Sequence, residues 1–388
     1  TSSTTSSTPR SHAAASATCE GRARPGPLST APEPNAILPA VTGPRQLDDE
    51  SPESLWTLLH ERGWGDGLPV VAPTVERVDA ALAAAGGDPD EVIAVLPPRG
   101  GRATRRDIAV NAVMAGCEPA TVTVVVAAVR ALGHHDLNLR GVNATTHPVA
   151  PLVIVHGRAA TELDFNAGLG AFGPGNRSNA TVGRAVRLVL LHIAGATPGP
   201  GDVATQGQPS KYTYCVAENA AASPWPAYHR AVGIDADSAV TVHCGENPHN
   251  VHDMESDSPT GILDKVASVM ATLGSNNAPI SGAEIFVGLC PEHAATIAGA
   301  GWARSDIQGY LFQRARRPVG EVRDAFDLLA WDPWMTALAD GDLVPITGTP
   351  TNIRVVVVGG PGKHSGGIPS GGMARSGTGP FDTAGPTP

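Results

Sequence analysis

The chain has 388 residues, of which 41% are hydrophobic and 16% charged, so it is long enough for one large or two closely joined domains. Its net charge of −10 makes nucleic acid and anionic membranes poor partners. The longest apolar runs, such as residues 121–132, are shorter than the roughly 20 residues that a membrane-spanning helix needs. We therefore expect a protein that is not embedded in a membrane.

Five cysteines lie far apart along the chain, and none belongs to a Cys-x-x-Cys pair. This odd number of separated cysteines does not suit a disulfide framework, which favours a reducing, cytoplasmic location. The sequence begins with Thr1 rather than Met, so the presence of an earlier targeting segment stays open.

Composition divides the chain into two tails and two central units. Residues 1–46 and 366–388 contain few large apolar side chains, so we expect both tails to be disordered. Residues 47–200 are expected to form a first α/β unit, and residues 201–365 a second one.

Between the tails, apolar β-branched runs alternate with segments of helical period. Runs of this kind predict strands at residues 92–96, 151–155, 212–216, 239–243, 284–289 and 353–358. The alternation predicts an α/β fold with largely parallel or mixed sheets and flanking helices.

Helices are expected between these strands. Thr104 and Asp107 have the spacing of a capping box, and the helical pattern that follows them ends at Gly116. A second helix is expected to begin at once, with Pro119 in its first turn. Further helices are predicted at about residues 179–193, 260–273, 291–300 and 305–316.

Cys117 lies between the end of one predicted helix and the start of the next. Free backbone N–H groups at a helix start favour a thiolate, although Glu118 opposes this effect. The pattern makes Cys117 a candidate catalytic thiol. The alternative is a small buried residue at a tight helix junction, because free cysteine is among the most buried residue types.

A glycine-rich loop, residues 170–179, leads into a helix that we expect to begin near Asn179 or Ala180. Such a junction presents N–H groups to an anion, and Asn176, Arg177 and Asn179 add amide and guanidinium donors. The loop matches neither a P-loop nor a dinucleotide-binding loop. A structural loop with a helix-capping asparagine is the alternative.

Residues 243–253 combine three histidines with acidic side chains just after a predicted strand. Imidazole and carboxylate groups are ordinary ligands of zinc and iron, so this loop is a candidate metal site. Its metal candidates are His243, His249, His252 and Asp253. The spacing fits no established metal motif, so a polar surface loop or a hydrogen-bonding site is the alternative.

Three further loops combine glycine with polar side chains near strands. They supply candidate substrate-binding residues, which are Asn143, Thr145 and His147 in the first loop, Lys211 in the second, and His364 and Ser365 in the third.

Glu218, just beyond a predicted strand, is a candidate general base or the partner of a cation.

Four segments resemble a little-characterised bacterial family that is associated with small (seleno)proteins carrying a UGSC motif. These segments are residues 66–69, 111–117, 173–177 and 246–250, and the similarity extends over roughly residues 55–365. The UGSC motif itself is absent from this chain. The resemblance implies thiol-linked chemistry at Cys117, with any selenocysteine or second redox centre supplied by a partner protein.

We therefore expect an enzyme that acts on a small anionic molecule by thiol-dependent redox or carbon–sulfur chemistry at Cys117. His249, His252 and Glu218 are the other catalytic candidates. One alternative is a metal-dependent lyase or hydrolase built on residues 243–253, and another is a non-catalytic binding or scaffold protein. We expect a homo-oligomer, with a small thiol protein or selenoprotein as a further partner, and the sequence identifies no cofactor.

Overall fold

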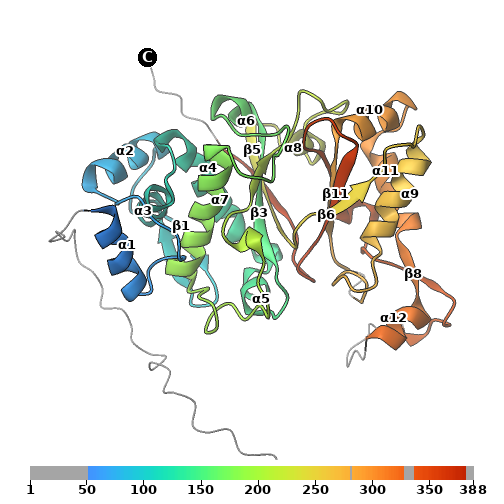
Figure 1. The fold of residues 1–388 in the computed structure, drawn as a ribbon, viewed down its shortest axis with the longest axis horizontal. Helices are drawn as coiled ribbons and strands as arrows, with labels where there is room; N and C mark the ends of the chain where they lie inside the picture. Colours follow the sequence, from blue (N-terminus) through green and yellow to red (C-terminus); the bar gives the residue numbers. More distant parts are fainter. Residues whose placement is uncertain (1–50, 280–281, 327–335, 382–388) are drawn as a thin grey trace, which may run out of the picture. The chain divides into compact units, whose positions relative to one another are not determined.

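The computed structural model describes residues 51–279, 282–326 and 336–381, which belong to one compact unit, Pro44–Pro388. The unit is an α/β fold in which helices flank sheets of parallel and antiparallel strands (Figure 1). This confirms the predicted fold class. None of the helices in the described ranges is both long and apolar enough to cross a membrane.

The first large sheet has the strand order β12-β5-β3-β4. Its strands are β3 (Ala150–Gly157), β4 (Cys215–Ala217), β5 (Ser238–Gly245) and β12 (Gly377–Pro380). Strands β3 and β4 are parallel, whereas β5 runs antiparallel to both β3 and β12. Val153 and Val155 point to one face of β3 and Leu152 and Ile154 to the other, and both faces are buried.

Helices cover the Val153 face of this sheet. They include α3 (Arg105–Ala115), α4 (Val122–Leu132) and α7 (Arg177–Val189), whose apolar residues share one core with the strands. The expected capping box is present, since Thr104 and Asp107 bond to each other's backbone N–H at the start of α3.

The second large sheet has the strand order β10-β7-β11-β6. Its strands are β6 (His249–His252), β7 (Ile285–Leu289), β10 (Ile353–Val357) and β11 (His364–Pro369). β7 and β10 are parallel, and β11 is antiparallel to β6 and β7. Its outer face packs against α9 (Pro259–Met270), α10 (Pro291–Gly299) and α11 (Arg304–Arg314).

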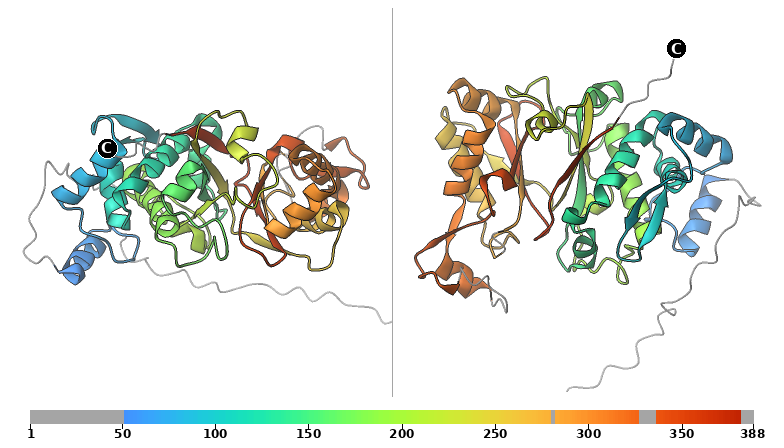
Figure 2. Two further views of the ribbon diagram at one scale, coloured as in Figure 1. Left: turned by 90° about the horizontal axis from the view of Figure 1, so that it is seen from above. Right: turned by 180° about the vertical axis from the view of Figure 1, so that it is seen from behind.

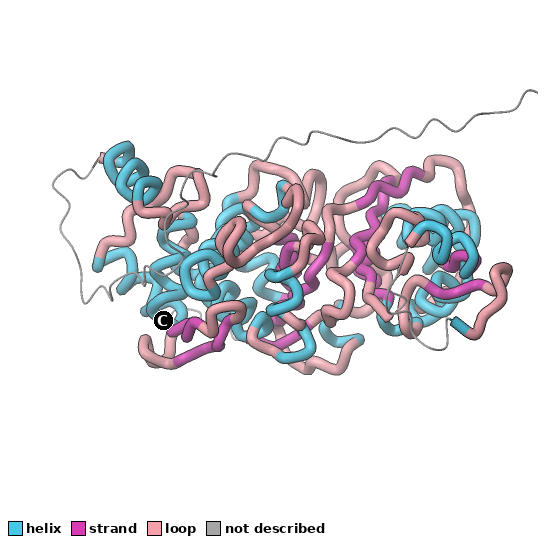
Figure 3. The backbone as a smooth tube through the Cα atoms, turned by 90° about the horizontal axis from the view of Figure 1, so that it is seen from below, coloured by secondary structure: helices cyan, strands magenta, loops and turns pink. Residues whose placement is uncertain are grey.

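The inner faces of the two sheets meet in a shared apolar cluster that joins Leu152 and Ile154 to Phe286, Val356 and Ile368. The chain therefore forms four layers in the order helices, sheet, sheet, helices. Figures 1 and 2 show α4 and α7 beyond one sheet and α9 and α11 beyond the other. In Figure 3 the magenta strands of these sheets lie between groups of cyan helices.

Smaller elements surround this frame. The helices among them are α1 (Pro52–Glu61), α2 (Val75–Ala85), α5 (Leu139–Ala144), α6 (Arg158–Glu162), α8 (Tyr228–Ala231) and α12 (Val319–Ala325). The strands form two small pairs, β1 (Val92–Leu96) with β2 (Gly101–Thr104) and β8 (Arg316–Pro318) with β9 (Leu343–Pro345). The short 3₁₀ turns are η1 (Pro119–Thr121), η2 (His135–Leu137), η4 (Pro209–Lys211) and η5 (Pro350–Asn352), and a π turn, η3 (Leu190–Ala194), extends α7.

Each predicted strand overlaps an observed strand, and each predicted helix overlaps an observed helix. One helix start was misplaced: α7 begins at Arg177, because the side chain of Asn176 accepts a hydrogen bond from the Asn179 N–H and so caps the helix earlier.

The predicted disorder of residues 366–388 is wrong for residues 366–381. Residues up to Pro369 continue β11, and β12 pairs with β5, so partner strands order a segment whose own composition is poor in apolar side chains. The expected boundary after residue 200 falls within the first sheet, since β3 precedes it and β4 and β5 follow it. The expected tail at residues 1–46 and the end of the chain from residue 382 lie outside the described residues.

Candidate functional site

Three of the polar loops singled out in the sequence line one cavity of about 300 Å³. Residues 170–173 come from the glycine-rich loop, Pro248 and Asn250 from the histidine-rich loop, Gly359 from the loop between β10 and β11, and residues 364–366 from the start of β11. This volume lies at the lower end of the range for small-molecule sites. The cavity is therefore the main candidate functional site in the described residues.

The floor of the cavity is apolar. Phe286, Val358 and Ile368 belong to the apolar cluster between the sheets, and they also line the cavity. Phe172 comes from the glycine-rich loop, is 42% exposed, and contacts the ring of Tyr214. Gly288 lines the same floor, and a side chain there would press against the Phe286 ring. A ligand with an apolar body fits this lining.

One exposed histidine, His364, lines the rim of the cavity, and a second, His252, lies beside it on the neighbouring strand β6. His252 Nδ1 lies 3.4 Å from His364 Nε2, and His364 Nδ1 lies 2.9 Å from the Asn250 amide oxygen. That oxygen only accepts, so Nδ1 of His364 donates the hydrogen bond. In neutral His364 this leaves Nε2 as the acceptor, and His252 Nδ1–H can donate to it.

Glu246 is held between two other predicted residues, His147 and His249. Its carboxylate oxygens lie 2.8 Å from His147 Nε2 and 3.0 Å from His249 Nε2. Burial raises the pKa of Glu246, but the hydrogen bonds from both histidines outweigh this and lower it to about 2. The bond to Glu246 also raises the pKa of His249. These groups form an ion-pair cluster, and none of the three lines the cavity.

The metal ligands predicted in residues 243–253 do not converge. His243 bonds to Ser376 Oγ and to the Ile368 carbonyl, and burial lowers its pKa to about 4. Asp253 accepts hydrogen bonds from the backbone of residues 255 and 256 and pairs with Lys265. His249 contacts Glu246, and His252 contacts His364. The four side chains therefore form no common metal site.

Ser365 lines the cavity, but its hydroxyl forms hydrogen bonds with groups on the opposite side of the sheet. Its Oγ lies 3.0 Å from the Cys290 N–H and 2.8 Å from His293 Nδ1, both on the α10 side. Its partner across the ladder is Val251, which packs against α9. Ser365 therefore anchors the start of α10, and His364 is the cavity-facing residue of this pair.

Cys117 lies at the predicted junction, but in a setting that disfavours a thiolate. It is partly buried and packs against the helical core beside Thr121 and Thr181. Burial raises the pKa of the thiol to about 11, although Thr181, Thr121 and the Arg177 charge act in the other direction. Cys117 does not line the cavity.

The predicted anion-binding side chains are all engaged by protein groups. Asn176 caps α7, and its amide donates to the Asp164 carbonyl. Arg177 donates to the Gly116 carbonyl and pairs with Glu118, while Asn179 is buried and bonds to backbone groups of Asn166 and Ala171. The loop lies beside Cys117, since Arg177 contacts Gly116 and Glu118, but these side chains tie the loop to its neighbours.

Asn143 and Lys211 line a second, much smaller cavity of about 10 Å³, which has room for about one water molecule. Asn143 donates to the Pro97 carbonyl, and Lys211 pairs with Asp202 at 2.7 Å. Thr145 accepts the backbone N–H of His147. The structure gives these three residues local structural partners.

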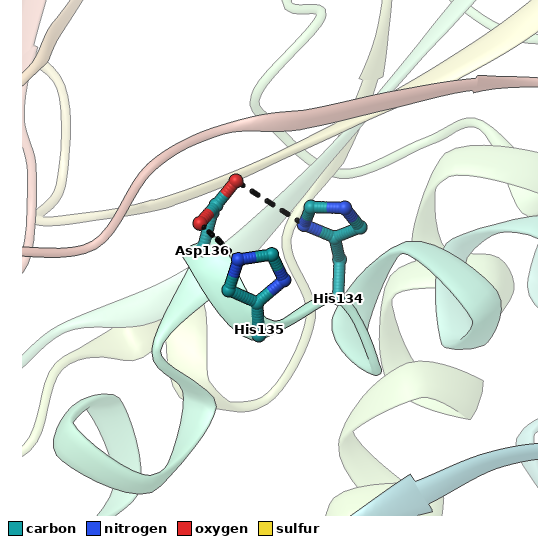
Figure 4. A group of neighbouring side chains, drawn as sticks. All are labelled: His134, His135 and Asp136. Atoms are coloured by element: carbon teal, nitrogen blue, oxygen red, sulfur yellow. Dashed lines mark ion pairs between the residues drawn. The ribbon is translucent and has the colours of Figure 1, made fainter.

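Two groups of side chains in the described ranges have the composition and spacing of metal ligands. His134, His135 and Asp136 are consecutive and exposed, with both histidines directed at the carboxylate (Figure 4). His156, Glu218 and His229 are buried and come from three separate segments. Glu218 was predicted, and His156 shared its signal of a polar residue at a strand end. His229, in the short helix α8, gave no recognisable signal.

No family model, no curated protein and no solved structure matches this chain. The resemblance to the family associated with UGSC-motif proteins therefore stays a prediction.

Proposed function

We propose that the protein is an enzyme that binds a small carboxylic acid with an apolar body in the 300 Å³ cavity. The observation that carries this proposal is the convergence of three polar, glycine-containing loops on one apolar floor. An apolar body would lie on Phe286, Val358 and Ile368, and an acidic head group would face His364 and His252. The proposal keeps the expected small anionic substrate and moves its binding site from the Asn176–Asn179 turn to this rim.

The two rim histidines supply the chemistry in this proposal. Two imidazole rings 3.4 Å apart can pass one proton between them. His364, fixed by Asn250, is the group nearer the cavity floor, and His252 connects it to solvent. The pair is suited to remove a proton from a carbon atom of the bound carboxylate or to return one.

Thiol chemistry at Cys117 has less support than acid–base chemistry at the rim. The thiol lies outside the cavity wall, and its pKa of about 11 leaves little thiolate near neutral pH. Thiol chemistry therefore remains the weaker of two proposals.

Calorimetric titration of the full chain with benzoate tests the binding step, and benzyl alcohol serves as the neutral analogue. Gly366 lines the cavity opposite Pro248, so Gly366→Val should weaken benzoate binding by about tenfold or more. The control is Gly367→Ala, which adds its side chain next to Val269 on the other face of the same strand and should bind normally. His364→Gln should weaken binding of benzoate but not of benzyl alcohol. Equal benzoate affinity in Gly366→Val and the unaltered chain would overturn the proposal, as would the absence of any benzoate binding.

A further inference from the structure

The buried group formed by His156, Glu218 and His229 lies where the two sheets adjoin. His156 is near the end of β3, and Glu218 directly follows the parallel strand β4, where its N–H bonds to the Val155 carbonyl. His229 belongs to α8. The three side chains are at most 2% exposed, and one ligand atom from each lies within 4.8 Å of the other two.

Hydrogen bonds occupy the Nε2 atoms of both imidazoles and leave their Nδ1 atoms available to the group. His229 Nε2 lies 3.0 Å from the Ala236 carbonyl, which only accepts, so Nε2 carries the proton and Nδ1 of the neutral ring has a free lone pair. His156 Nε2 lies 2.8 Å from Thr241 Oγ1, and its Nδ1 lies 2.7 Å from Glu218 Oε2. Carbonyl and hydroxyl partners of this kind fix the orientation of metal-bound histidines.

Hydrogen bonding alone leaves this group incomplete. Nδ1 of His229 is buried and has no hydrogen-bond partner among the described residues. A buried polar atom without a partner costs roughly 1–3 kcal/mol, so such atoms are rare and need an explanation. An ion held jointly by Nδ1 of His229, Nδ1 of His156 and the Glu218 carboxylate would supply the missing partner.

We propose that His156, Glu218 and His229 form a binding site for one divalent transition-metal ion of the zinc and ferrous-iron class. Two imidazoles and one carboxylate are a common ligand set for these ions, whereas magnesium and calcium prefer oxygen ligands. Tetrahedral zinc with ligands at about 2.0–2.2 Å separates those ligands by roughly 3.3 Å. The ion would replace the proton that His156 Nδ1 now shares with Glu218, and the neutral ring would carry its proton on Nε2 and donate it to Thr241 Oγ1. The His156–Glu218 contact would lengthen, and His229 would move toward it.

Arg304 limits how the carboxylate can bind. Its guanidinium lies 4.0 Å from Glu218 Oε1, while Oε2 is the oxygen that faces His156. The backbone N–H of Tyr228 also donates to this carboxylate, at 2.9 Å from Oε1 and 3.0 Å from Oε2. Glu218 would therefore bind the ion through Oε2, while Oε1 keeps the Tyr228 N–H and the Arg304 charge. Because Arg304 opposes any cation, most of the affinity must come from the two imidazoles, which favours ions that bind nitrogen strongly.

The test compares metal content after unfolding the full chain in denaturant with chelator and refolding it with or without Zn²⁺. Refolding is needed because the site is buried and the folded chain would exchange slowly. We expect about one zinc per chain by mass spectrometry of the desalted protein, together with a higher thermal midpoint than in the zinc-free sample. Refolding with Co²⁺ should give the visible absorption of a cobalt–imidazole site.

Four variants decide whether the ion occupies this site. His229→Gln should lose the zinc and the zinc-dependent rise in thermal midpoint, and Glu218→Gln provides a second variant at the site. His243→Gln is the matched control, because His243 is equally buried and also bonds to a carbonyl, but its second nitrogen already has Ser376 as a partner. It should keep the zinc.

The fourth variant, His134→Ala with His135→Ala, removes the exposed group in Figure 4 and should also keep the zinc. The proposal is overturned if the refolded chain takes up no stoichiometric zinc. It is also overturned if His229→Gln and Glu218→Gln both retain the ion, or if only the exposed double variant loses it. None of these results depends on a ligand in the cavity.

Discussion

Cys117 and Cys290 each precede a helical turn in a similar sequence, but the pKa values of their thiols are shifted in opposite directions. We call these two places the Cys117 junction and the Cys290 junction. Cys117 precedes Glu118 and Pro119 at the start of the turn before α4, and Cys290 precedes Pro291 and Glu292 at the start of α10. Burial raises the pKa of Cys117 to about 11. Burial acts in the same direction on Cys290, yet the pKa of Cys290 is lowered, because His293 and Ser365 lie beside its thiol.

The difference shows that a helix start alone does not activate a thiol. At Cys117 the nearby cation, Arg177, is exposed and already paired with Glu118. At Cys290 the imidazole of His293 is buried, its own pKa is raised, and it is fixed by Ser365 and by the Asp253 carbonyl. The Cys-x-x-His spacing at a helix start therefore accompanies the lower thiol pKa, whereas catalysis at Cys117 stays a prediction.

The largest expected effect is on the free energy of unfolding, through a substitution at the Cys290 junction. His293→Leu should lower the free energy of unfolding by about 2–4 kcal/mol, because it leaves the Asp253 carbonyl and the Ser365 hydroxyl buried without their imidazole partner. Thr181→Val beside Cys117 is the comparison and should cost less than about 1 kcal/mol. Denaturant unfolding of both variants measures this, and equal losses would mean that the two junctions do not differ in structural importance.

The next effect concerns alkaline pH. A folded thiol with a pKa of about 11 keeps its proton longer than the unfolded thiol at 9.0, so Cys117 stabilises the fold below pH 9 and loses that contribution as pH rises toward 11. Cys290 has a lowered pKa, so its contribution grows as pH rises through that pKa and is complete above 9.0.

Removing each thiol should therefore change the alkaline stability curve in opposite ways. Cys117→Ala should remove a loss of about 2–3 kcal/mol between pH 9 and 11, and Cys290→Ala should make the alkaline loss steeper. Unfolding curves across this pH range, with thiolate absorbance recorded in parallel, measure both. If Cys290→Ala leaves thiolate absorbance below pH 9 unchanged, Cys290 has no activated thiol and the contrast disappears.

Much of the fold could be predicted because its central elements have clear apolar periodicity. The pattern located β1, β3, β4, β5, β7 and β10 and the helices around them. It did not locate β6, β11 and β12, whose residues are largely His, Gly, Ser, Thr and Pro. These segments become strands only by pairing, β12 with β5, β11 with β7, and β6 with β11.

The site was predicted only in part, for the same reason. Local sequence located the polar loops, and three of them do meet at the cavity. Local sequence did not show to which side of the sheet each side chain points. His364 and Ser365 therefore looked equivalent, although they point to opposite sides of β11. The sequence interpretation also grouped candidate metal ligands that are close in sequence, such as His243 and His252. It could not group His156 with His229, because these residues are 73 positions apart and meet only in the folded chain.

The smallest expected effect is that of removing Arg177, the exposed cation at the Cys117 junction. Arg177→Ala removes a charge that lowers the pKa of Cys117, but the Arg177 side chain is 61% exposed and its charge is screened by water and by Glu118. The thiolate titration of Cys117 should shift upward only slightly, and the free energy of unfolding should fall by about 0.5–1 kcal/mol through the lost hydrogen bonds to the Gly116 carbonyl. Glu118→Gln is the paired control, since it keeps Arg177 and should shift the titration downward. A large upward shift in Arg177→Ala would mean that Arg177 does for Cys117 what His293 does for Cys290, and thiol chemistry at Cys117 would regain support.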